Sequence, residues 1–481
     1  MKRLILIFLA LLTLMAVAQK REFRGAWLQT VYREDYARRT TEQNRAYLRA
    51  QLDSLRSAGF NAVIFQVRPQ ADAFYPSELE PWSRYLCPDG NAPRPAWDPL
   101  QFVIDEAHAR GMELHAWLNP YRITATRRQT VPKGHIAARY PGRTVRYDGR
   151  LYFDPGQPAN RDHIAAVVRD IVTRYDIDGI HFDDYFYPYP VKGVRFDDRA
   201  SYARYGRGMT LDDWRRHNVD LLIERIHTVI AEVKPWVVFG VSPFGIWRNA
   251  SSDPEGSRSS GLQNYDDLYA DILSWVRKGW IDYQMPQLYW PLDHKAAPSR
   301  LLLDWWADHT SGRHMYIGQD VARTMNPGES APCELHAKLS LASRRPEIGG
   351  HCWWPGYDVC ANRAGVADSL RTVYHRHPAL VPAYPWLCDD APCAPRALRT
   401  KGGELIWTCD EPQGKATDAV RWAVYRFAPG ERVDLTRADA LLGVTYAARW
   451  PLGKAGGIYV VTSLSRVNCE SAPSSPIMIS L

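Results

Sequence analysis

Hydrophobic positions between residues 23 and 374 alternate between two patterns along the chain. Short apolar runs such as Ala62–Val67 have the length and the β-branched content of buried strands. Between these runs, longer segments such as Thr41–Ala58 place apolar residues every three or four positions, which predicts amphipathic helices. This alternation of strand and helix is typical of a parallel sheet that is covered by helices.

The alternation occurs eight times, and eight parallel strands close a (β/α)8 barrel, or TIM barrel. An open doubly wound sheet is the alternative. Its dinucleotide-binding form is disfavoured because the first turn lacks a Gly-x-Gly-x-x-Gly phosphate loop. We therefore predict an α/β protein built on a TIM barrel. The predicted strands are Phe23–Thr30, Ala62–Val67, Glu113–Leu118, the run ending at Phe182, Trp236–Val241, Asp282–Met285, His314–Ile317 and Gly350–Trp353.

The pattern changes after residue 376, so the barrel is expected over residues 19–376. Residues 377–395 are rich in proline, which predicts a linker. Residues 396–481 contain short alternating runs with turn residues between them, which indicates a small all-β sandwich of the fibronectin type III kind. We interpret this second domain as a scaffold. Its predicted strands are Glu404–Cys409, Arg421–Phe427, Gly457–Ser463 and Ile477–Leu481.

Residues 1–18 have the features of a signal peptide: a basic start, an apolar run from Leu4 to Leu14, and the small-x-small site Ala16-Val17-Ala18. Later apolar stretches are all too short to span a membrane. We expect an exported protein, periplasmic or extracellular, without an integral membrane segment after signal removal. The eight cysteines suit an oxidising compartment. Proximity suggests the pairs Cys388–Cys393 and Cys409–Cys469.

The charge pattern favours no nucleic-acid partner. The formal net charge is +7, but Lys and Arg are scattered, and zinc-finger and RNA-recognition signatures are missing. Trp and Tyr are abundant, and they concentrate just after predicted strands, where flat rings beside carboxylates suit the apolar faces of sugars. No cofactor is expected, and no Cys-x-x-Cys pair indicates a metal site.

Adjacent carboxylates, Asp183 and Asp184, follow the fourth predicted strand. Hydrolysis of a glycosidic bond requires two carboxyl groups, one to protonate the leaving oxygen and one to act as nucleophile or base. Neighbours on an extended strand point to opposite faces, so we expect these two to be half of a pair rather than the whole. The candidates for the other half, each near a strand end, are Asp72, Asp154 and Asp320.

Other side chains at predicted strand ends can bind sugar hydroxyls or stack on sugar rings. The predicted substrate-binding residues are Trp27, Gln66, Arg68, Trp117, Asn119, Tyr121, Arg122, His181, Tyr185, Trp247, Gln287, Tyr289, Trp290 and Trp354. Serine nucleophile chemistry is disfavoured, because no Gly-x-Ser-x-Gly elbow precedes a helix. His115, His181 and Asp183 could form a metal ligand set, although buried histidines satisfied by hydrogen bonds are the better interpretation.

Several of these segments together resemble the bacterial glycosyl-hydrolase-like family ten. They are Arg24-Gly25-Ala26-Trp27, Phe65–Pro69 with Asp72, His115–Arg122, Asp178–Tyr185, Ser242–Asn249 and Gln287–Trp290. The resemblance implies a TIM barrel and an exported glycosidase, and family members include a hydrolase of peptidoglycan glycan strands stripped of their peptides. It supports a role for Asp183 and Asp184. Ser242 and Gln287 stand where many barrel glycosidases carry an acid, so the resemblance leaves the partner acid open.

The leading hypothesis is therefore an exported glycoside hydrolase that cleaves a bacterial polysaccharide, in particular peptidoglycan glycan, with two carboxylates. Its partner would be a polysaccharide or oligosaccharide from the cell wall. One alternative is a glycan-binding barrel with little turnover, because the acid partner is not obvious. Another is a metal-dependent carbohydrate deacetylase that uses the two histidines.

Overall fold

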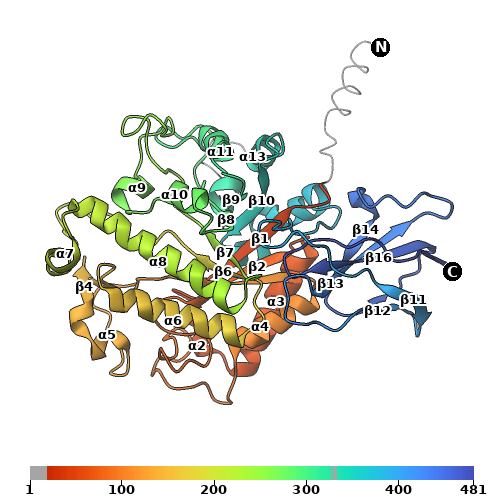
Figure 1. Cartoon of the computed structure of the whole chain (residues 1–481), viewed down its shortest axis with the longest axis horizontal. Helices are drawn as coiled ribbons and strands as arrows, with labels where there is room; N and C mark the ends of the chain where they lie inside the picture. Colours follow the sequence, from red (N-terminus) through yellow and green to blue (C-terminus); the bar gives the residue numbers. More distant parts are fainter. Residues whose placement is uncertain (1–18, 327, 329–332, 481) are drawn as a thin grey trace, which may run out of the picture.

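The computed structural model describes residues 19–326, 328 and 333–480. The signal peptide predicted for residues 1–18 lies outside the described residues. Figure 1 shows a helical shell around a central barrel, with a separate all-β part that carries the C-terminus. Within the described ranges, none of the helices has the length and apolar character needed to cross a membrane.

Eight parallel strands close into a barrel, as predicted, in the order β1-β10-β9-β8-β7-β6-β3-β2. The short apolar runs become its strands because both faces are buried, one by the helices and the other by the barrel interior. The predicted bounds agree to within a few residues. The strands are β1 (Phe23–Leu28), β2 (Ala62–Arg68), β3 (Glu113–Leu118), β6 (Gly179–Phe182), β7 (Val238–Val241), β8 (Tyr283–Gln284), β9 (His314–Asp320) and β10 (Ile348–Trp354).

Local signals fix several helix starts. Thr40 and Gln43 form a reciprocal capping box at the start of α3, and Asp98 accepts a hydrogen bond from the Gln101 amide (3.1 Å) before Pro99 opens α4. The helices are α2 (Asp35–Arg38), α3 (Thr41–Ser57), α4 (Pro99–Ala109), α5 (Ile136–Arg139), α6 (Pro158–Arg174), α7 (Arg199–Tyr205), α8 (Leu211–Val233), α9 (Asn264–Asp267), α10 (Ile272–Arg277), α11 (Ser299–Ala307), α12 (Val321–Met325), α13 (Leu335–Ala342), α14 (Gly356–Cys360) and α15 (Val366–Ser369).

The long connection between β3 and α6 contains an antiparallel ribbon that the hydrophobic pattern did not predict. It pairs β4 (Thr144–Tyr147) with β5 (Arg150–Phe153). An isolated bridge between Arg122 and Tyr152 ties the ribbon to the end of β3. Figure 1 shows β4 and α7 together at the end of the barrel that lies away from the C-terminal part.

The C-terminal part consists of two antiparallel sheets, as expected of a sandwich. One has the order β11-β12-β15 and the other the order β14-β13-β16-β17. All four predicted strands are present, and the likeness to fibronectin type III stays a prediction. The strands are β11 (Arg396–Lys401), β12 (Glu404–Thr408), β13 (Ala419–Phe427), β14 (Leu441–Thr445), β15 (Arg449–Pro451), β16 (Gly457–Ser465) and β17 (Ile477–Ile479).

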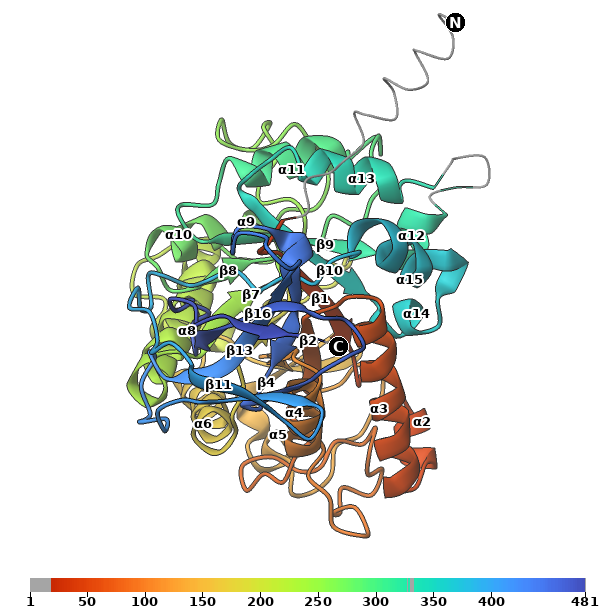
Figure 2. The same cartoon turned by 90° about the vertical axis from the view of Figure 1, so that its right-hand side faces the viewer.

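The sandwich packs against the end of the barrel where the strands begin (Figures 1 and 2). Residues 377–395, all described, contain neither helix nor strand and close this end. The Trp386 indole donates to Asp282 (2.8 Å), and the Tyr384 hydroxyl contacts that of Tyr316 (3.1 Å). The predicted linker is therefore packed rather than free.

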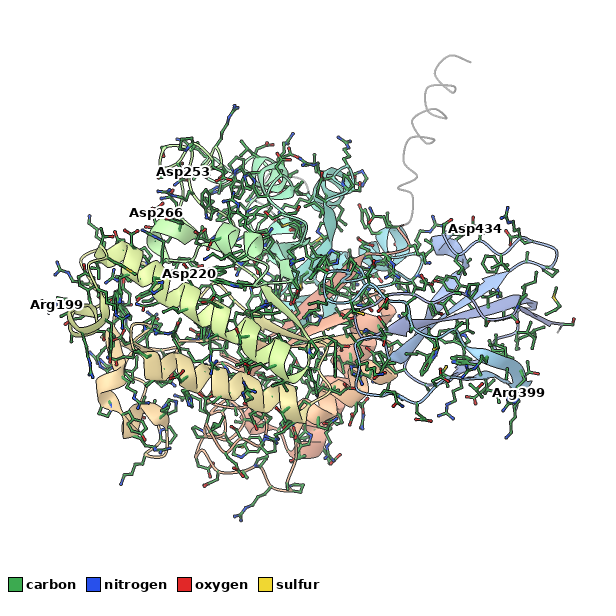
Figure 3. The ribbon with its side chains drawn as sticks, viewed as in Figure 1. Arg199, Asp220, Asp253, Asp266, Arg399 and Asp434 are labelled. Atoms are coloured by element: carbon green, nitrogen blue, oxygen red, sulfur yellow. The ribbon has the colours of Figure 1, made fainter. Side chains whose placement is uncertain are left out.

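Charged side chains gather on the surface of both parts. Figure 3 labels Arg199 on α7, and Arg399 and Asp434 in the sandwich, all of which are exposed. All eight cysteines are free thiols in the structure, so it contains neither the Cys388–Cys393 nor the Cys409–Cys469 disulfide. The Cys469 thiol instead donates to the carbonyl of Cys388 (3.2 Å).

Candidate active site

Asp183 and Asp184 lie immediately after β6, at the mouth where the barrel strands end. Their residues are only 4% and 2% exposed, so both carboxyl groups are nearly withdrawn from solvent. In a TIM barrel this mouth is where the connections carry the chemistry. Two carboxyl groups held there in low-dielectric surroundings can differ in protonation, which acid–base catalysis requires.

Asp183 is held by donors from the end of β3. The Trp117 indole N–H donates to its carboxylate (3.0 Å), the Asn119 side-chain amide lies 3.0 and 3.1 Å from its two oxygens, and the backbone N–H of Tyr185 donates at 3.2 Å. Burial raises the pKa of Asp183, while the positive charge of Arg122 and these donors oppose the rise. Donors from three directions orient Asp183 as an acceptor.

Asp184 has a different environment. The Tyr189 hydroxyl donates to its carboxyl group, and Gln287 contacts the same group. Burial and then the neighbouring charge of Asp183 raise the pKa of Asp184 to about 6. A carboxyl group with this pKa keeps its proton in mildly acidic solution and can donate it.

Two of the three candidate partner acids accept hydrogen bonds that hold nearby loops in place. Asp72 accepts from the backbone N–H groups of Gln70 (3.0 Å) and Arg84 (3.3 Å), and it organises the loop after β2. Asp154 accepts from the Ser201 hydroxyl and from the N–H of Gly156 (2.8 Å), before α6. Burial raises the pKa of both groups, that of Asp72 to about 6.

Asp320 lies at the same mouth as Asp184. It caps α12 by accepting from the Arg323 N–H (2.7 Å), and it is partly exposed. Burial raises the pKa of Tyr289 most, followed by the charges of Asp184, Cys352 and Asp320. Asp320 is thus the candidate whose charge, like that of Asp184, acts on Tyr289.

Aromatic side chains surround the acid pair. Tyr189 packs edge-on against Tyr185 (5.4 Å between ring centroids) and against Phe244 (5.9 Å), and Phe244 packs against Trp290 (5.2 Å). On the side of Asp183, Trp354 packs edge-on against Trp117 (5.9 Å). The partly exposed rings of Tyr185, Tyr289, Trp290 and Trp354 can face a ligand. Trp247 lies elsewhere, stacked on Trp305 and hydrogen-bonded to Asp271.

Several predicted substrate-binding residues lie inside the wall of the site. Arg68 is completely buried, forms a two-point ion pair with Glu80, and donates to the carbonyl of Asn119 (2.5 Å). Gln66 accepts from the N–H groups of Thr30 and Val31. The Tyr121 ring is also fully buried. Arg68 thus holds the backbone that carries Asn119, and Gln66 holds the backbone after β1.

Arg122 bridges the wall and the mouth. Its guanidinium lies 5.0 Å from the centroid of the Tyr185 ring, and its Nε donates to the carbonyl of Pro69 (3.1 Å). Its own backbone N–H donates to the Asn119 side chain (2.9 Å), which also binds Asp183. Arg122 therefore supplies the positive charge nearest to the acid pair.

His181 is engaged on both ring nitrogens. Its Nε2 lies 3.1 Å from the Trp27 indole N–H and 3.0 Å from the Ser242 hydroxyl, and its Nδ1 lies 2.9 Å from the Tyr283 hydroxyl. Burial and then the charge of His115 hold the pKa of His181 well below its usual range. Nowhere in residues 19–326, 328 or 333–480 do three His, Cys, Asp or Glu side chains gather as metal ligands would.

Residue-level reasoning missed Tyr189, Phe244, Ser242 as a hydrogen-bonding group, and Tyr283. Tyr189 lies five residues after Asp184, between Pro188 and Pro190. Its position in this aromatic, proline-bordered run is the one sequence signal that could have identified it. The contact between Tyr189 and Asp184 depends on how the loop folds back, which no periodicity encodes.

Comparison with known proteins extends this picture. Residues 22–332 match the family described as Glycosyl hydrolase-like 10. The chain belongs to this family. It is 41% identical over 431 residues to the glycosyl hydrolase YngK of Bacillus subtilis, covering 86% of this chain and 84% of that protein. It is 39% identical over 358 residues to the glycosyl hydrolase DigH of Escherichia coli K12, covering 68% and 81%.

The glycoside hydrolase domain of PgaB (BpsB) from Bordetella bronchiseptica has a similar fold. It superposes with a TM-score of 0.51 at 15% identity, over 74% of this chain and 99% of that one. The predicted family, the predicted TIM barrel and the expectation of a glycoside hydrolase are thus confirmed.

Proposed function

We propose that this glycoside hydrolase is exported and cleaves the glycan strands of peptidoglycan after their peptides have been removed. The observation that carries this proposal is the buried acid pair Asp183–Asp184, set among aromatic rings at the barrel mouth. A strand of alternating amino sugars offers apolar ring faces to such rings and hydroxyl groups to Asn119 and Gln287.

Charge supports this substrate class. A muramic acid residue that has lost its peptide carries a free lactyl carboxylate, so the stripped strand is an anionic polymer. The full chain has a formal net charge of +7, of which Lys2 and Arg3 of the proposed signal peptide contribute +2, so the balance stays positive after its removal; Arg122 lies at the mouth beside Tyr185. Long-range attraction of this sign accelerates the encounter with an anionic polymer and weakens as salt is added.

In the proposed mechanism, Asp184 is the proton donor to the glycosidic oxygen. Its pKa of about 6 lets it keep the proton that a carboxyl group of ordinary pKa would lose. Asp183 stays an acceptor and stabilises the positive charge that develops on the sugar ring. Asp320, whose charge acts on Tyr289 as that of Asp184 does, serves as the second carboxylate of the pair.

The test is release of reducing ends from stripped glycan strands by the wild type and by Asp184→Asn. We expect kcat to fall by about two to four orders of magnitude, because the variant lacks a transferable proton. Asp72→Asn is the matched control, since Asp72 has a similarly raised pKa but organises a loop. Equal release by the wild type and Asp184→Asn would remove Asp184 from the mechanism. Tight glycan binding without any product would favour the binding-protein alternative.

A further inference from the structure

Five polar side chains form a continuous hydrogen-bonded line through the apolar interior of the barrel. This polar file consists of Glu113, His115, Tyr283, His181 and Ser242. The Glu113 carboxylate lies 3.2 Å from His115 Nε2, the Tyr283 hydroxyl lies 2.9 Å from Nδ1 of both histidines, and Ser242 Oγ lies 3.0 Å from His181 Nε2. All five are buried. A buried polar group destabilises the folded state unless it has a hydrogen-bond partner. Five such groups in a barrel core therefore indicate a specific role for the polar file.

The Trp27 contact sets the tautomer of His181, and from there the proton order of the file can be followed to Glu113. The Trp27 indole can only donate, so the His181 Nε2 that it contacts must be an acceptor. A neutral His181 then carries its proton on Nδ1 and donates it to the Tyr283 oxygen. When His115 is neutral, the Tyr283 hydroxyl in turn donates to His115 Nδ1, which leaves the His115 proton on Nε2, facing Glu113.

The far end of the file is held by the sandwich domain. Arg421 on β13 donates to Glu113 Oε1 (2.6 Å), and Asn468, after β16, donates to the same oxygen (2.8 Å). Burial opposes ionisation of Glu113, but Arg421, His115 and Asn468 outweigh it and lower the pKa of Glu113 to about 2. Glu113 is therefore a carboxylate that accepts from His115 at any ordinary pH.

The Ser242 end of the polar file is linked to the acid pair through Gln287. The carbonyl of Ser242 accepts from the Gln287 side chain (3.0 Å), and Gln287 contacts Asp184. Trp27, which contacts the same Nε2 of His181 as Ser242 does, lies in the interior of the barrel next to Gly318 of β9. His181 is thus linked to Gln287 through Ser242, whose side chain contacts His181 and whose backbone carbonyl accepts from Gln287.

We propose that Arg421, in the sandwich domain, is a positioning residue for the hydrolytic site. It keeps Glu113 charged, and the charged Glu113 favours, from the other end of the polar file, the same proton order that the Trp27 contact imposes, with His181 Nε2 as the acceptor. The proposal rests on the function proposed above for the identity of the site. It assigns the sandwich a part in the reaction, in place of the scaffold role expected from the sequence.

Protonation of Glu113 would favour the opposite order of protons along the polar file. A neutral Glu113 donates to His115 Nε2, the hydroxyl of Tyr283 then points at His181 Nδ1, and the His181 proton moves to Nε2. Two N–H groups would then face each other at Trp27, and the Ser242 hydroxyl would keep only the more distant Phe182 carbonyl (3.5 Å) as an acceptor. The charged or titratable groups around Glu113 are Arg421, His115, Tyr283, Tyr316 and Tyr384, with Asp178 and Tyr446 on the other side of Arg421.

The experiment compares the full-length wild type with Arg421→Met, Arg421→Lys and Tyr283→Phe, with Arg466→Gln as the control. The Arg466 side chain also joins the sandwich to the barrel, at Asp176 (3.1 Å), and it contacts none of the five side chains of the file; only its backbone carbonyl accepts from Arg421 (3.1 Å), and the substitution leaves that carbonyl in place. Histidine-selective ¹⁵N NMR reports which nitrogen of His115 and His181 carries the proton, and it needs no substrate. Hydrolysis of stripped glycan gives kcat and KM over the same pH range.

In the wild type we expect His181 to keep its proton on Nδ1 between about pH 8 and pH 5, since Glu113 stays charged throughout. In Arg421→Met the order reverses within that range as Glu113 takes up a proton. There kcat falls by roughly tenfold to a hundredfold with KM unchanged, the scale expected for a small displacement of reacting groups. Arg421→Lys keeps the charge and restores most of the rate, and Arg466→Gln behaves as the wild type.

Tyr283→Phe removes the hydroxyl that joins the two histidines and leaves every buried charge in place. If Arg421→Met does not fold, this variant tests whether the polar file affects kcat. Wild-type kcat in Tyr283→Phe, or in a folded Arg421→Met, overturns the proposal. So does a loss of kcat in Arg421→Met with the proton order unchanged, because that outcome is purely structural. If the wild type itself does not cleave the glycan, the proposed function fails, while the NMR result still decides the proton order.

Discussion

The buried ion pair between Arg68 and Glu80 gives a sharp prediction for stability. Both side chains are fully inaccessible to solvent, and the guanidinium also holds the carbonyls of Asn119 and Pro120 beneath the acid pair. Glu80→Gln removes the charge of the carboxylate and keeps the size of the side chain. Arg68 is then buried without a counter-charge, a state that costs about 3–5 kcal/mol in comparable pairs.

The pKa of Glu80 gives an independent estimate of the same quantity. Burial would raise this pKa, but Arg68 and His163 lower it from 4.5 to about 2. That difference corresponds to about 3 kcal/mol of folding free energy, since one pH unit is worth about 1.4 kcal/mol. Because the pKa is lower in the folded state, this contribution is complete above about pH 4.5 and is lost as the pH falls toward 2, so that about 1 kcal/mol is left at pH 3.

Equilibrium urea unfolding, followed by tryptophan fluorescence at pH 7 and pH 3, measures the free energy of unfolding of the wild type and of Glu80→Gln. Glu42→Gln is the matched control, because Glu42 pairs with Arg45 but its side chain is 69% exposed. An exposed pair of this kind contributes at most about 1 kcal/mol. The reasoning is refuted if Glu80→Gln is as stable as Glu42→Gln at pH 7, or if its deficit is as large at pH 3 as at pH 7.

Further predictions concern the acid groups. Tyr189→Phe removes a donor that lowers the pKa of Asp184, so the alkaline fall of kcat/KM, expected near pH 6 in the wild type, should move to higher pH; an unchanged pH profile would show that the hydroxyl does not act on the acid. Asp320→Asn keeps a side chain that can cap α12, so stability should change by less than about 1 kcal/mol while kcat falls; wild-type kcat would exclude Asp320 as the second carboxylate. Asp154→Asn should keep kcat within about threefold and lower the melting temperature, because Asp154 serves local structure. Excess chelator should leave kcat unchanged, and a loss that added metal restores would support the deacetylase alternative.

The hydrophobic pattern was sufficient to predict the barrel. Strands buried on both faces, such as β2, stand out as continuous apolar runs, and helices such as α3 carry both periodicity and a capping box. The β4–β5 ribbon was missed because each strand has only four residues, and burial alternates along β4 but not along β5. Such short pairing is set by packing against neighbouring loops, and local sequence does not record it.

At the site, position along the chain predicted which residues lie near the mouth but not what each one contacts. Arg68 was expected at the surface of the pocket, yet Glu80, in a loop twelve residues later, pairs with it inside the wall. Tyr189 reaches Asp184 only because its loop folds back. Both contacts are tertiary, and a single sequence carries no signal for them.

The shared use of Glu113 and Asp178 by Arg421 limits how the two parts of this protein can be recombined. Glu113 opens β3 and Asp178 directly precedes β6, so two carboxylates at the base of the barrel take their countercharge from the sandwich. A barrel cut away from its sandwich would expose like charges that repel each other, together with a ring of apolar side chains around Tyr384. Exchange of one domain without the other would separate Arg421 from these two acids. We therefore expect relatives that keep one of the three residues to keep all of them.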